Sequence, residues 1–113
     1  MANIQRLQTI LQEVTAQAKA LLGQQLESVI LFGSYARGEE TQDSDIDIML
    51  ILDCPSVQAR MYRKRISHIA SRIGLEYDVV ISILVRTKAE FTQGIQYLPF
   101  YQNISREGIS IYG

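Results

Sequence analysis

The 113-residue sequence contains one cysteine, Cys54, and no long run of apolar residues. A single cysteine excludes an internal disulfide bond, and Cys54 is expected to be a small apolar residue near a strand end. The run Ile48 to Leu52 falls far short of the roughly 18 residues that a membrane span needs. No basic segment followed by an apolar run stands at the start, so no secretory signal is expected. The expected location is therefore cytoplasmic.

An excess of one charge sign is also missing. Eleven Lys and Arg residues against twelve Asp and Glu residues give a net charge of −1. This balance argues against non-specific binding of nucleic acid by the chain as a whole, so no direct nucleic-acid partner is expected. The length predicts a single domain over residues 1–113. A chain this short builds one core, so a large substrate platform would have to come from another chain.

The spacing of apolar residues predicts the order helix, strand, strand, helix, strand, two short helices, strand. Glycines 23 and 74 are the expected ends of the two long helices. The helices are expected over residues 4–21, 57–73, 87–93 and 99–107, and the strands over Leu26–Phe32, Ile46–Leu52, Tyr77–Val85 and Ile109–Tyr112.

The connection between the first two predicted strands limits the topology. It is short for a parallel crossover, which needs about a dozen residues or more, so an antiparallel or mixed sheet is expected. This argues against a doubly wound dinucleotide-binding fold. The strand Ile46–Leu52 ends in IMLIL, apolar on both faces, which is typical of a central strand covered on both sides.

The stretch LFGSYARGEETQDSDIDIMLIL, Leu31 to Leu52, places two acidic residues at the start of that apolar strand. Strand alternation puts Asp45 and Asp47 on one face. Two strand steps separate them by roughly 6.6 Å. At an effective dielectric near 20 their repulsion is about 2.5 kcal/mol. A fold accepts this cost more readily if a cation lies between the carboxylates.

Two other interpretations of this stretch fail. Gly33 and Gly38 have the spacing of a P-loop, but two glutamates follow where lysine and a hydroxyl residue are required. A calcium loop beginning at Asp43 would need glycine at Ile48 and glutamate at Cys54. A plain polar turn accounts for Asp43 but not for the two acidic residues at the strand.

A magnesium and triphosphate site accounts for the whole stretch. Magnesium typically takes one or two carboxylates together with substrate phosphates. Gly33 allows a sharp turn and Ser34 supplies a hydroxyl group and an amide. If Tyr35 opens a short helical turn, free N–H groups there would face an anion. Arg37 is either a phosphate or partner contact or a solvated surface charge.

Gly33-Ser34, ten residues and then Asp45-Ile46-Asp47 resemble the signature of nucleotidyltransferases of the DNA-polymerase-β-like superfamily. The sequence is most similar to the minimal, single-domain type called MNT, and the resemblance covers roughly Leu26 to Gly113, including the ending FYQNISREGISIYG. It implies an α+β nucleotidyltransferase fold with a small mixed β-sheet flanked by helices.

The resemblance also implies residue roles. Asp45 and Asp47 would bind the divalent ions, with two Mg²⁺ expected, and Asp78 in YDVVIS would be the third catalytic carboxylate on a later strand. Glu76 has the same strand face and is the alternative, with Asp78 favoured because its position is more interior. Gly33, Ser34 and Arg37 would bind the nucleotide, ATP being the usual substrate of the family.

MNT-type proteins usually act beside a small helical HEPN protein, commonly a ribonuclease toxin. The resemblance therefore implies an antitoxin that transfers AMP to a hydroxyl group of this partner, typically a tyrosine. A catalytically silent antitoxin that neutralises its partner by contact stays open. A small-molecule nucleotidyltransferase is less favoured, because those relatives generally carry a further helical domain.

The second long helix carries a cluster of basic residues off its apolar stripe, namely Arg60, Arg63, Lys64 and Arg65. A solvated face is the first interpretation of this cluster and a partner-docking face is the second.

Overall fold

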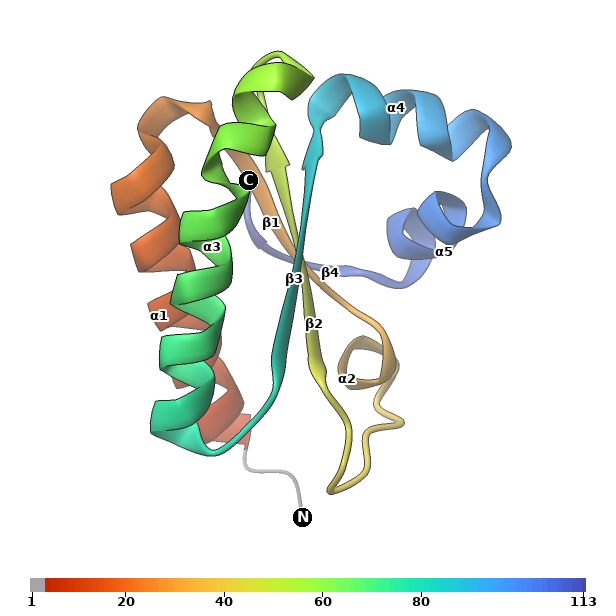
Figure 1. The fold of residues 1–113 in the computed structure, drawn as a ribbon. Coiled ribbons are helices and arrows are strands. Elements are labelled where there is room, and N and C mark those ends of the chain that lie inside the picture. Colours follow the sequence, from red (N-terminus) through yellow and green to blue (C-terminus); the bar gives the residue numbers. More distant parts are fainter. Residues whose placement is uncertain (1–3) are drawn as a thin grey trace.

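A computed structural model describes residues 4–113 of the chain. A four-stranded sheet in the order β3-β2-β1-β4 forms its centre (Figure 1). The strands are β1 (Leu26–Phe32), β2 (Ile46–Leu52), β3 (Ile81–Thr87) and β4 (Ile109–Tyr112). The helices are α1 (Ile4–Leu22), α2 (Ser34–Arg37), α3 (Ser56–Tyr77), α4 (Lys88–Tyr97) and α5 (Pro99–Glu107), with a 3₁₀ turn at Gly23–Gln25.

The sheet is mixed, as expected. β1 pairs antiparallel with β2 and with β4, whereas β2 and β3 run parallel. The parallel connection contains α3, which supplies the long crossover that a parallel pair requires.

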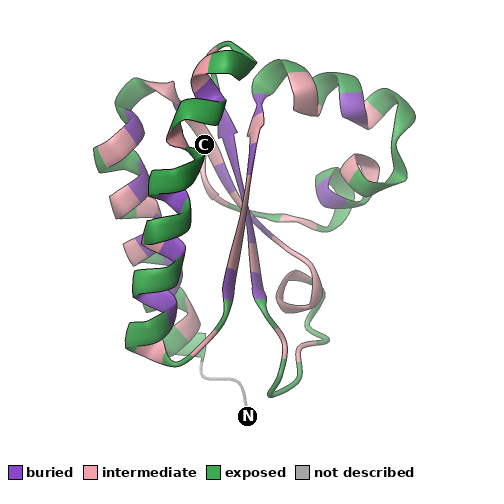
Figure 2. Cartoon of the chain, viewed as in Figure 1, coloured by how far each residue is buried: buried purple, intermediate pink, exposed green. Residues whose placement is uncertain are grey.

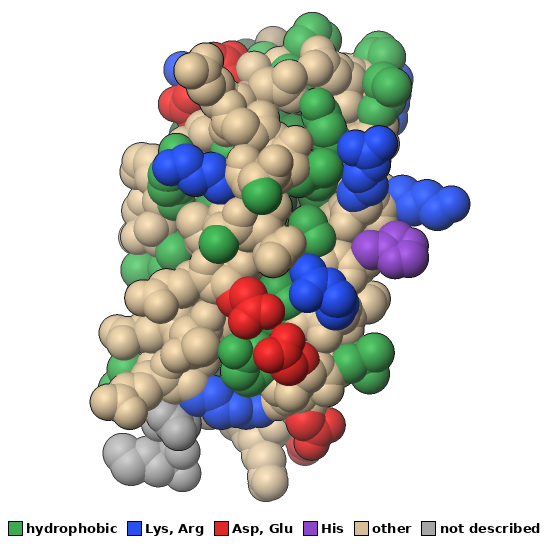
Figure 3. All heavy atoms as spheres, turned by 90° about the vertical axis from the view of Figure 1, so that its left-hand side faces the viewer, with side chains coloured by type: hydrophobic (Ala, Val, Ile, Leu, Met, Phe, Trp, Pro, Cys, Tyr) green, Lys and Arg blue, Asp and Glu red, His purple; other side chains and the backbone are tan. Residues whose placement is uncertain are grey.

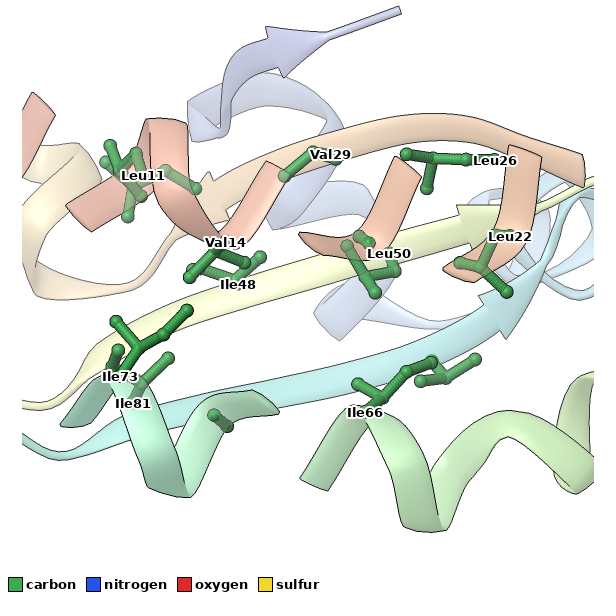
Figure 4. Packing of buried hydrophobic residues seen from close by; sticks show 14 of the residues in the cluster. Leu11, Val14, Leu22, Leu26, Val29, Ile48, Leu50, Ile66, Ile73 and Ile81 are labelled. Atoms are coloured by element: carbon green, nitrogen blue, oxygen red, sulfur yellow. The ribbon is translucent and has the colours of Figure 1, made fainter. Parts of the chain in front are cut away.

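Helices cover both faces of the sheet, with α1 and α3 on one face and α4 and α5 on the other (Figure 1). Side chains of α1 and α3 converge with those of the sheet in the larger core cluster, where Val14 and Ile73 lie near Ile48 of β2 (Figure 4). Met49 and Ile51, on the opposite face of β2, form the second cluster with Ile104 of α5. Buried residues therefore line both faces of β2 (Figure 2), which confirms the expected central strand.

The predicted end of α3 and start of the third strand are wrong. Gly74 does not end the helix, which continues for three more residues, to Tyr77. The Val79 N–H instead donates to the Gly74 carbonyl at 2.9 Å. A Cβ on Gly74 would lie 2.7 Å from the Val79 carbonyl oxygen, so this glycine permits a close chain contact. Strand β3 consequently begins at Ile81 rather than at Tyr77.

A capping box formed by Thr87 and Glu90 starts α4. The Glu90 N–H donates to the Thr87 hydroxyl at 3.1 Å, and the Thr87 N–H donates to the Glu90 carboxylate at 2.8 Å. The helix that follows is longer than predicted and reaches Tyr97. Across residues 4–113, no helix is both long enough and apolar enough to span a bilayer.

Candidate active site

The bend between β1 and α2 is built on Gly33. Its φ of 75° and ψ of −155° lie in a region that is essentially restricted to glycine. A Cβ at this position would collide with the Asp47 carboxylate oxygen Oδ2 and would lie 3.2 Å from Asp47 Cγ. The absence of a side chain therefore lets the bend lie directly against the carboxylate of Asp47.

One helical turn follows the bend. The Ala36 and Arg37 N–H groups donate to the Gly33 carbonyl at 3.1 and 3.2 Å. Gly38 ends the turn in the left-handed conformation, with φ of 70°. The expected short helix is present, and it begins one residue earlier than predicted, at Ser34, whose side chain is half-buried.

The two acidic residues at the start of β2 are electrostatically coupled. Asp45 is exposed and directly precedes the strand, whereas Asp47 is half-buried within it. Burial is the main cause that raises the pKa of Asp47 above its ordinary value of 3.8. The negative charge of Asp45 raises this pKa further, and the positive charge of Arg37 lowers it. The fold therefore holds Asp47 where its ionised form is less favourable than in water.

Arg37 compensates this charge only in part. Its guanidinium Nε lies 2.9 Å from Glu39 and its Nη1 lies 3.8 Å from Glu107. The Arg37 guanidinium thus forms ion pairs with two glutamates, both of them substantially exposed. The same positive charge also lowers the pKa of Asp47. It stands at the edge of the bend, where an incoming anion could replace the glutamates.

The structure does not bring Asp78 together with this pair. Asp78 is an exposed residue at the C-terminal cap of α3, with φ of 55°, and not a strand residue. Glu76 lies in the last turn of the same helix and is also exposed. Among residues 4–113, no three His, Cys, Asp or Glu side chains form a group that could hold one metal ion. The expectation that Asp78 completes a three-carboxylate centre is therefore wrong for the described residues. Asp45 and Asp47 form a pair without it.

Asp45 and Asp78 do share a cleft. An open hollow of about 1400 Å³ lies between the start of α1, the end of α3 and the loop before β2. Both aspartates line it, together with Tyr35. Asp47 is not part of this lining; it lies on the face of β2 that carries Met49 and Ile51. On the α1–α3 side the cleft therefore reaches Asp45, and Asp47 lies on the other face of the sheet.

Ser82 is the neighbour that the sequence pattern missed. In the parallel pairing of β2 and β3, Ser82 is the partner of Asp47. On the other side of β2, Asp47 pairs with Phe32 of β1. Paired residues of neighbouring strands have their side chains on the same face of the sheet. A half-buried serine therefore stands where a third carboxylate would have to stand to join Asp47. A lone serine in an apolar strand carries no signal, and only the register identifies it.

The donor chemistry fits a magnesium ion held partly by substrate. Two coupled carboxylates, one of them desolvated, supply the hard oxygen ligands that magnesium prefers. An ion with only one or two protein carboxylates completes its octahedron with water and phosphate oxygens. The contact between Gly33 and Asp47 puts the bend at this pair, so one bound nucleotide could meet both.

Comparison with known proteins agrees with this geometry. The family model described as "Nucleotidyltransferase domain" matches residues 11–109. "Putative protein adenylyltransferase MJ0141" of Methanocaldococcus jannaschii is 34% identical over 93 residues, which cover 81% of this chain and 91% of that protein. "Putative protein adenylyltransferase MJ0604" of the same organism is 33% identical over 87 residues, which cover 77% of this chain and 79% of that protein.

Solved structures share the fold. A toxin–antitoxin crystallised with AMP-PNP superposes with a TM-score of 0.54 at 16% identity, covering 88% of this chain and 71% of that one. A mutant of the toxin–antitoxin MntA-HpeT gives a TM-score of 0.53 at 14% identity, over 88% of this chain and 70% of that one. The family match over nearly the whole chain, the two curated relatives and the bend at the carboxylate pair lead to one conclusion: this chain is a member of the nucleotidyltransferase domain family.

Proposed function

We propose that this nucleotidyltransferase transfers AMP from ATP to a hydroxyl group of a partner protein in a Mg²⁺-dependent reaction. The hydroxyl oxygen forms a bond to the α-phosphorus, and the bond between that phosphorus and the bridging oxygen to the β-phosphate breaks. Pyrophosphate leaves with the electron pair, and the hydroxyl proton passes to solvent. The products are an AMP ester of the partner and pyrophosphate.

The contact between Gly33 and the Asp47 carboxylate carries this proposal. It joins a tight bend to an acidic pair of which Asp47 is half-buried, and phosphoryl chemistry needs both parts at one place. The names of the curated relatives favour a protein as the acceptor, since both are called protein adenylyltransferases and match over most of their length.

Each residue of the site has a proposed role. The Ser34 hydroxyl and the backbone at Gly33 bind the β- and γ-phosphates, and Arg37 exchanges its glutamate partners for a phosphate. Asp45 and Asp47 would hold the metal. Bound magnesium would supply charge neutralisation on the triphosphate and on the leaving pyrophosphate. No shared ligand role is proposed for Asp78, because it does not join the pair.

The proposed partner is a helical protein of the HEPN family, with a tyrosine as acceptor, and the proposed role is that of an antitoxin. The cleft beside Asp45 gives such an acceptor a place next to the exposed member of the acidic pair. Two of the solved structures that share this fold are toxin–antitoxin proteins, one of them with AMP-PNP. The reaction is proposed to take place in the cytoplasm, where ATP and magnesium are both abundant.

The test is incubation of the chain with ATP, MgCl₂ and a purified HEPN-family toxin, followed by intact-mass spectrometry of that toxin. One or more AMP additions are expected with the wild type, and none with Asp47→Asn or without magnesium. Asp43→Asn is the matched control, since Asp43 is an exposed loop residue, and it should retain transfer. Full transfer by Asp47→Asn would overturn the proposal.

Stoichiometric neutralisation by a silent antitoxin is the second candidate. The observation in its favour is the serine at the strand position beside Asp47, where no third carboxylate is present. The same incubation separates the two functions. Loss of toxin activity with no change in the toxin's mass would support the silent antitoxin, and a mass increase would exclude it.

A further inference from the structure

The outward side of α3 carries both aliphatic and basic side chains. Buried residues such as Ile66 and Ile73 mark the inner side of this helix. Helical periodicity places the opposite residues on one strip. We call this strip the α3 face, and it consists of Val57, Met61, Lys64, Arg65, His68, Arg72 and Leu75, all exposed.

The aliphatic residues stand at the two ends of the α3 face. Val57 is 63% exposed and Met61 is 75% exposed near the start of the helix, and Leu75 is 85% exposed near its end. Scattered apolar side chains are normal on a surface. Here, however, Val57 and Met61 also line an open hollow of about 570 Å³, which is completed by Pro55, Gln58, Tyr62 and Arg65. A hollow of this kind can receive one apolar side chain of another molecule.

The middle of the α3 face is strongly basic. Five of the eleven Lys and Arg residues lie between positions 60 and 72, and no acidic residue occurs between Asp53 and Glu76. Arg60 and Arg63 precede the three basic residues of the face in the sequence. None of the five forms an ion pair with another residue of the described chain. Lys and Arg side chains gather around the single histidine at the right-hand edge of this side of the molecule (Figure 3).

This charge distribution does not serve the helix itself. The first turn of α3 has no acidic residue, although negative charge at that end would favour the helix dipole. Like charges four residues apart, such as Arg60 and Lys64, repel each other. The chain has a net charge of −1, yet α3 carries a cluster of unpaired positive charges that does not stabilise the helix. Such a concentration is explained by an external partner of opposite charge.

We infer that the α3 face is a docking surface for a partner protein that presents an acidic helix with an aliphatic side chain near each end. The acidic side chains would face Lys64, Arg65 and Arg72. The aliphatic side chains would meet the hollow at Met61 and the exposed Leu75. Docking is independent of catalysis. Where the proposed function holds, docking has a geometric consequence: Leu75 also lines the cleft that contains Asp45, so a docked partner lies beside that cleft.

Other occupants fit this face less well. A second copy of the chain would bring its own basic strip against this one. The exposed residues of the face include no Phe, Tyr or Trp, Tyr62 at the hollow is half-buried, and the aliphatic ends have no counterpart in nucleic acid. A membrane-surface helix needs a broad apolar side, and that side of α3 is buried in the core.

The test uses a synthetic helical peptide with a glutamate-rich centre and one leucine near each end, titrated into the labelled chain. Binding is measured by fluorescence anisotropy and located by amide chemical shifts. We expect a Kd of about 0.1 mM or tighter, weakening with salt, with shifts confined to α3. The double variant Lys64→Glu/Arg72→Glu should weaken binding about tenfold or more.

The matched control is Lys88→Glu/Arg106→Glu, which changes the net charge equally at exposed residues of α4 and α5. It should bind the peptide within about twofold of the wild type. Equal losses in both double variants, shifts away from α3, or no binding would overturn the inference. Met61→Ala provides a second test if the charge reversal unfolds the chain, and it should also weaken binding.

Single-stranded RNA and phosphatidylserine vesicles are the competing probes. Tighter binding of either one than of the peptide would overturn the inference in favour of that class of partner. Asp47→Asn should bind the peptide like the wild type. A failure of AMP transfer and a failure of docking are therefore separate results.

Discussion

At the scale of single residues, Gly33 and Gly38 offer a controlled comparison. Both have positive φ, but only Gly33 faces the Asp47 carboxylate, whereas nothing lies within 4 Å of a Cβ on Gly38. Gly33→Ala should lower the free energy of unfolding by about 1–3 kcal/mol through backbone strain. It should also reduce AMP transfer by roughly 100-fold, because Asp47 must move. Urea unfolding and a transfer assay measure the two effects.

Gly38→Ala is the control for that prediction. It should cost about 1–2 kcal/mol in stability, since alanine must adopt the left-handed conformation, and it should keep most of the transfer activity. Similar activity losses in the two variants would show that the contact with Asp47 is not the decisive feature.

The raised pKa of Asp47 predicts how stability depends on pH. In the folded chain, burial and the charge of Asp45 disfavour the ionised form, so the folded state binds this proton more tightly than the unfolded state. The contribution to stability is therefore complete below the ordinary pKa of 3.8 and is lost as pH rises through the raised value.

Asp47→Asn removes this dependence. Without magnesium at neutral pH, the variant should melt a few degrees higher than the wild type, since about 1 kcal/mol shifts the melting temperature of a domain this size by roughly 4–8 °C. The difference should disappear in acid. Thermal unfolding from pH 3 to pH 8 measures it, and a constant or inverted difference would contradict the assignment of the shift to Asp47.

At the scale of elements, the sequence identified every strand and each of the longer helices, because their apolar periodicity reflects burial directly. The strands β1, β2 and β4 have the predicted bounds. The error that affects the site lies at the end of α3, where Gly74 resembles a helix stop. Its actual role is a contact with the Val79 carbonyl, which is a tertiary feature that no local pattern encodes.

That local error changed the predicted site. With a strand beginning at Tyr77, Asp78 would have been a strand neighbour of the acidic pair. The longer helix and the later start of β3 place Ser82 beside Asp47 and leave Asp78 at the helix cap. The spacing of Gly33, Asp45 and Asp47 was informative because these residues flank one short loop, whereas the register between β2 and β3 depends on the whole crossover.

Ser82→Asp tests this register. A carboxylate at that position would join Asp45 and Asp47, so affinity for Mn²⁺, used as a probe for magnesium, should rise about tenfold. The added repulsion should lower stability without metal by about 1–2 kcal/mol. Titration followed by electron paramagnetic resonance measures the affinity. Ser110→Asp, at an exposed position of β4, is the matched control and should leave metal affinity unchanged.

At the scale of the whole molecule, nucleotide binding should stabilise the fold only through the proposed site. With AMP-PNP and magnesium at about 100 times Kd, the free energy of unfolding should rise by about 2.7 kcal/mol. Asp47→Asn and Gly33→Ala should lose most of this gain. Differential scanning fluorimetry provides the measurement. A full shift in either variant would mean that the nucleotide binds elsewhere.

The position of β2 has a consequence for the durability of the site. This strand is hydrogen-bonded on both sides, to β1 and to β3, and its side chains belong to both core clusters. Its amide hydrogens should exchange with deuterium only when the entire chain opens. The carboxylate of Asp47 is therefore anchored in the slowest-exchanging part of the protein, and heating should abolish catalysis and structure together, with no inactive but folded stage between them.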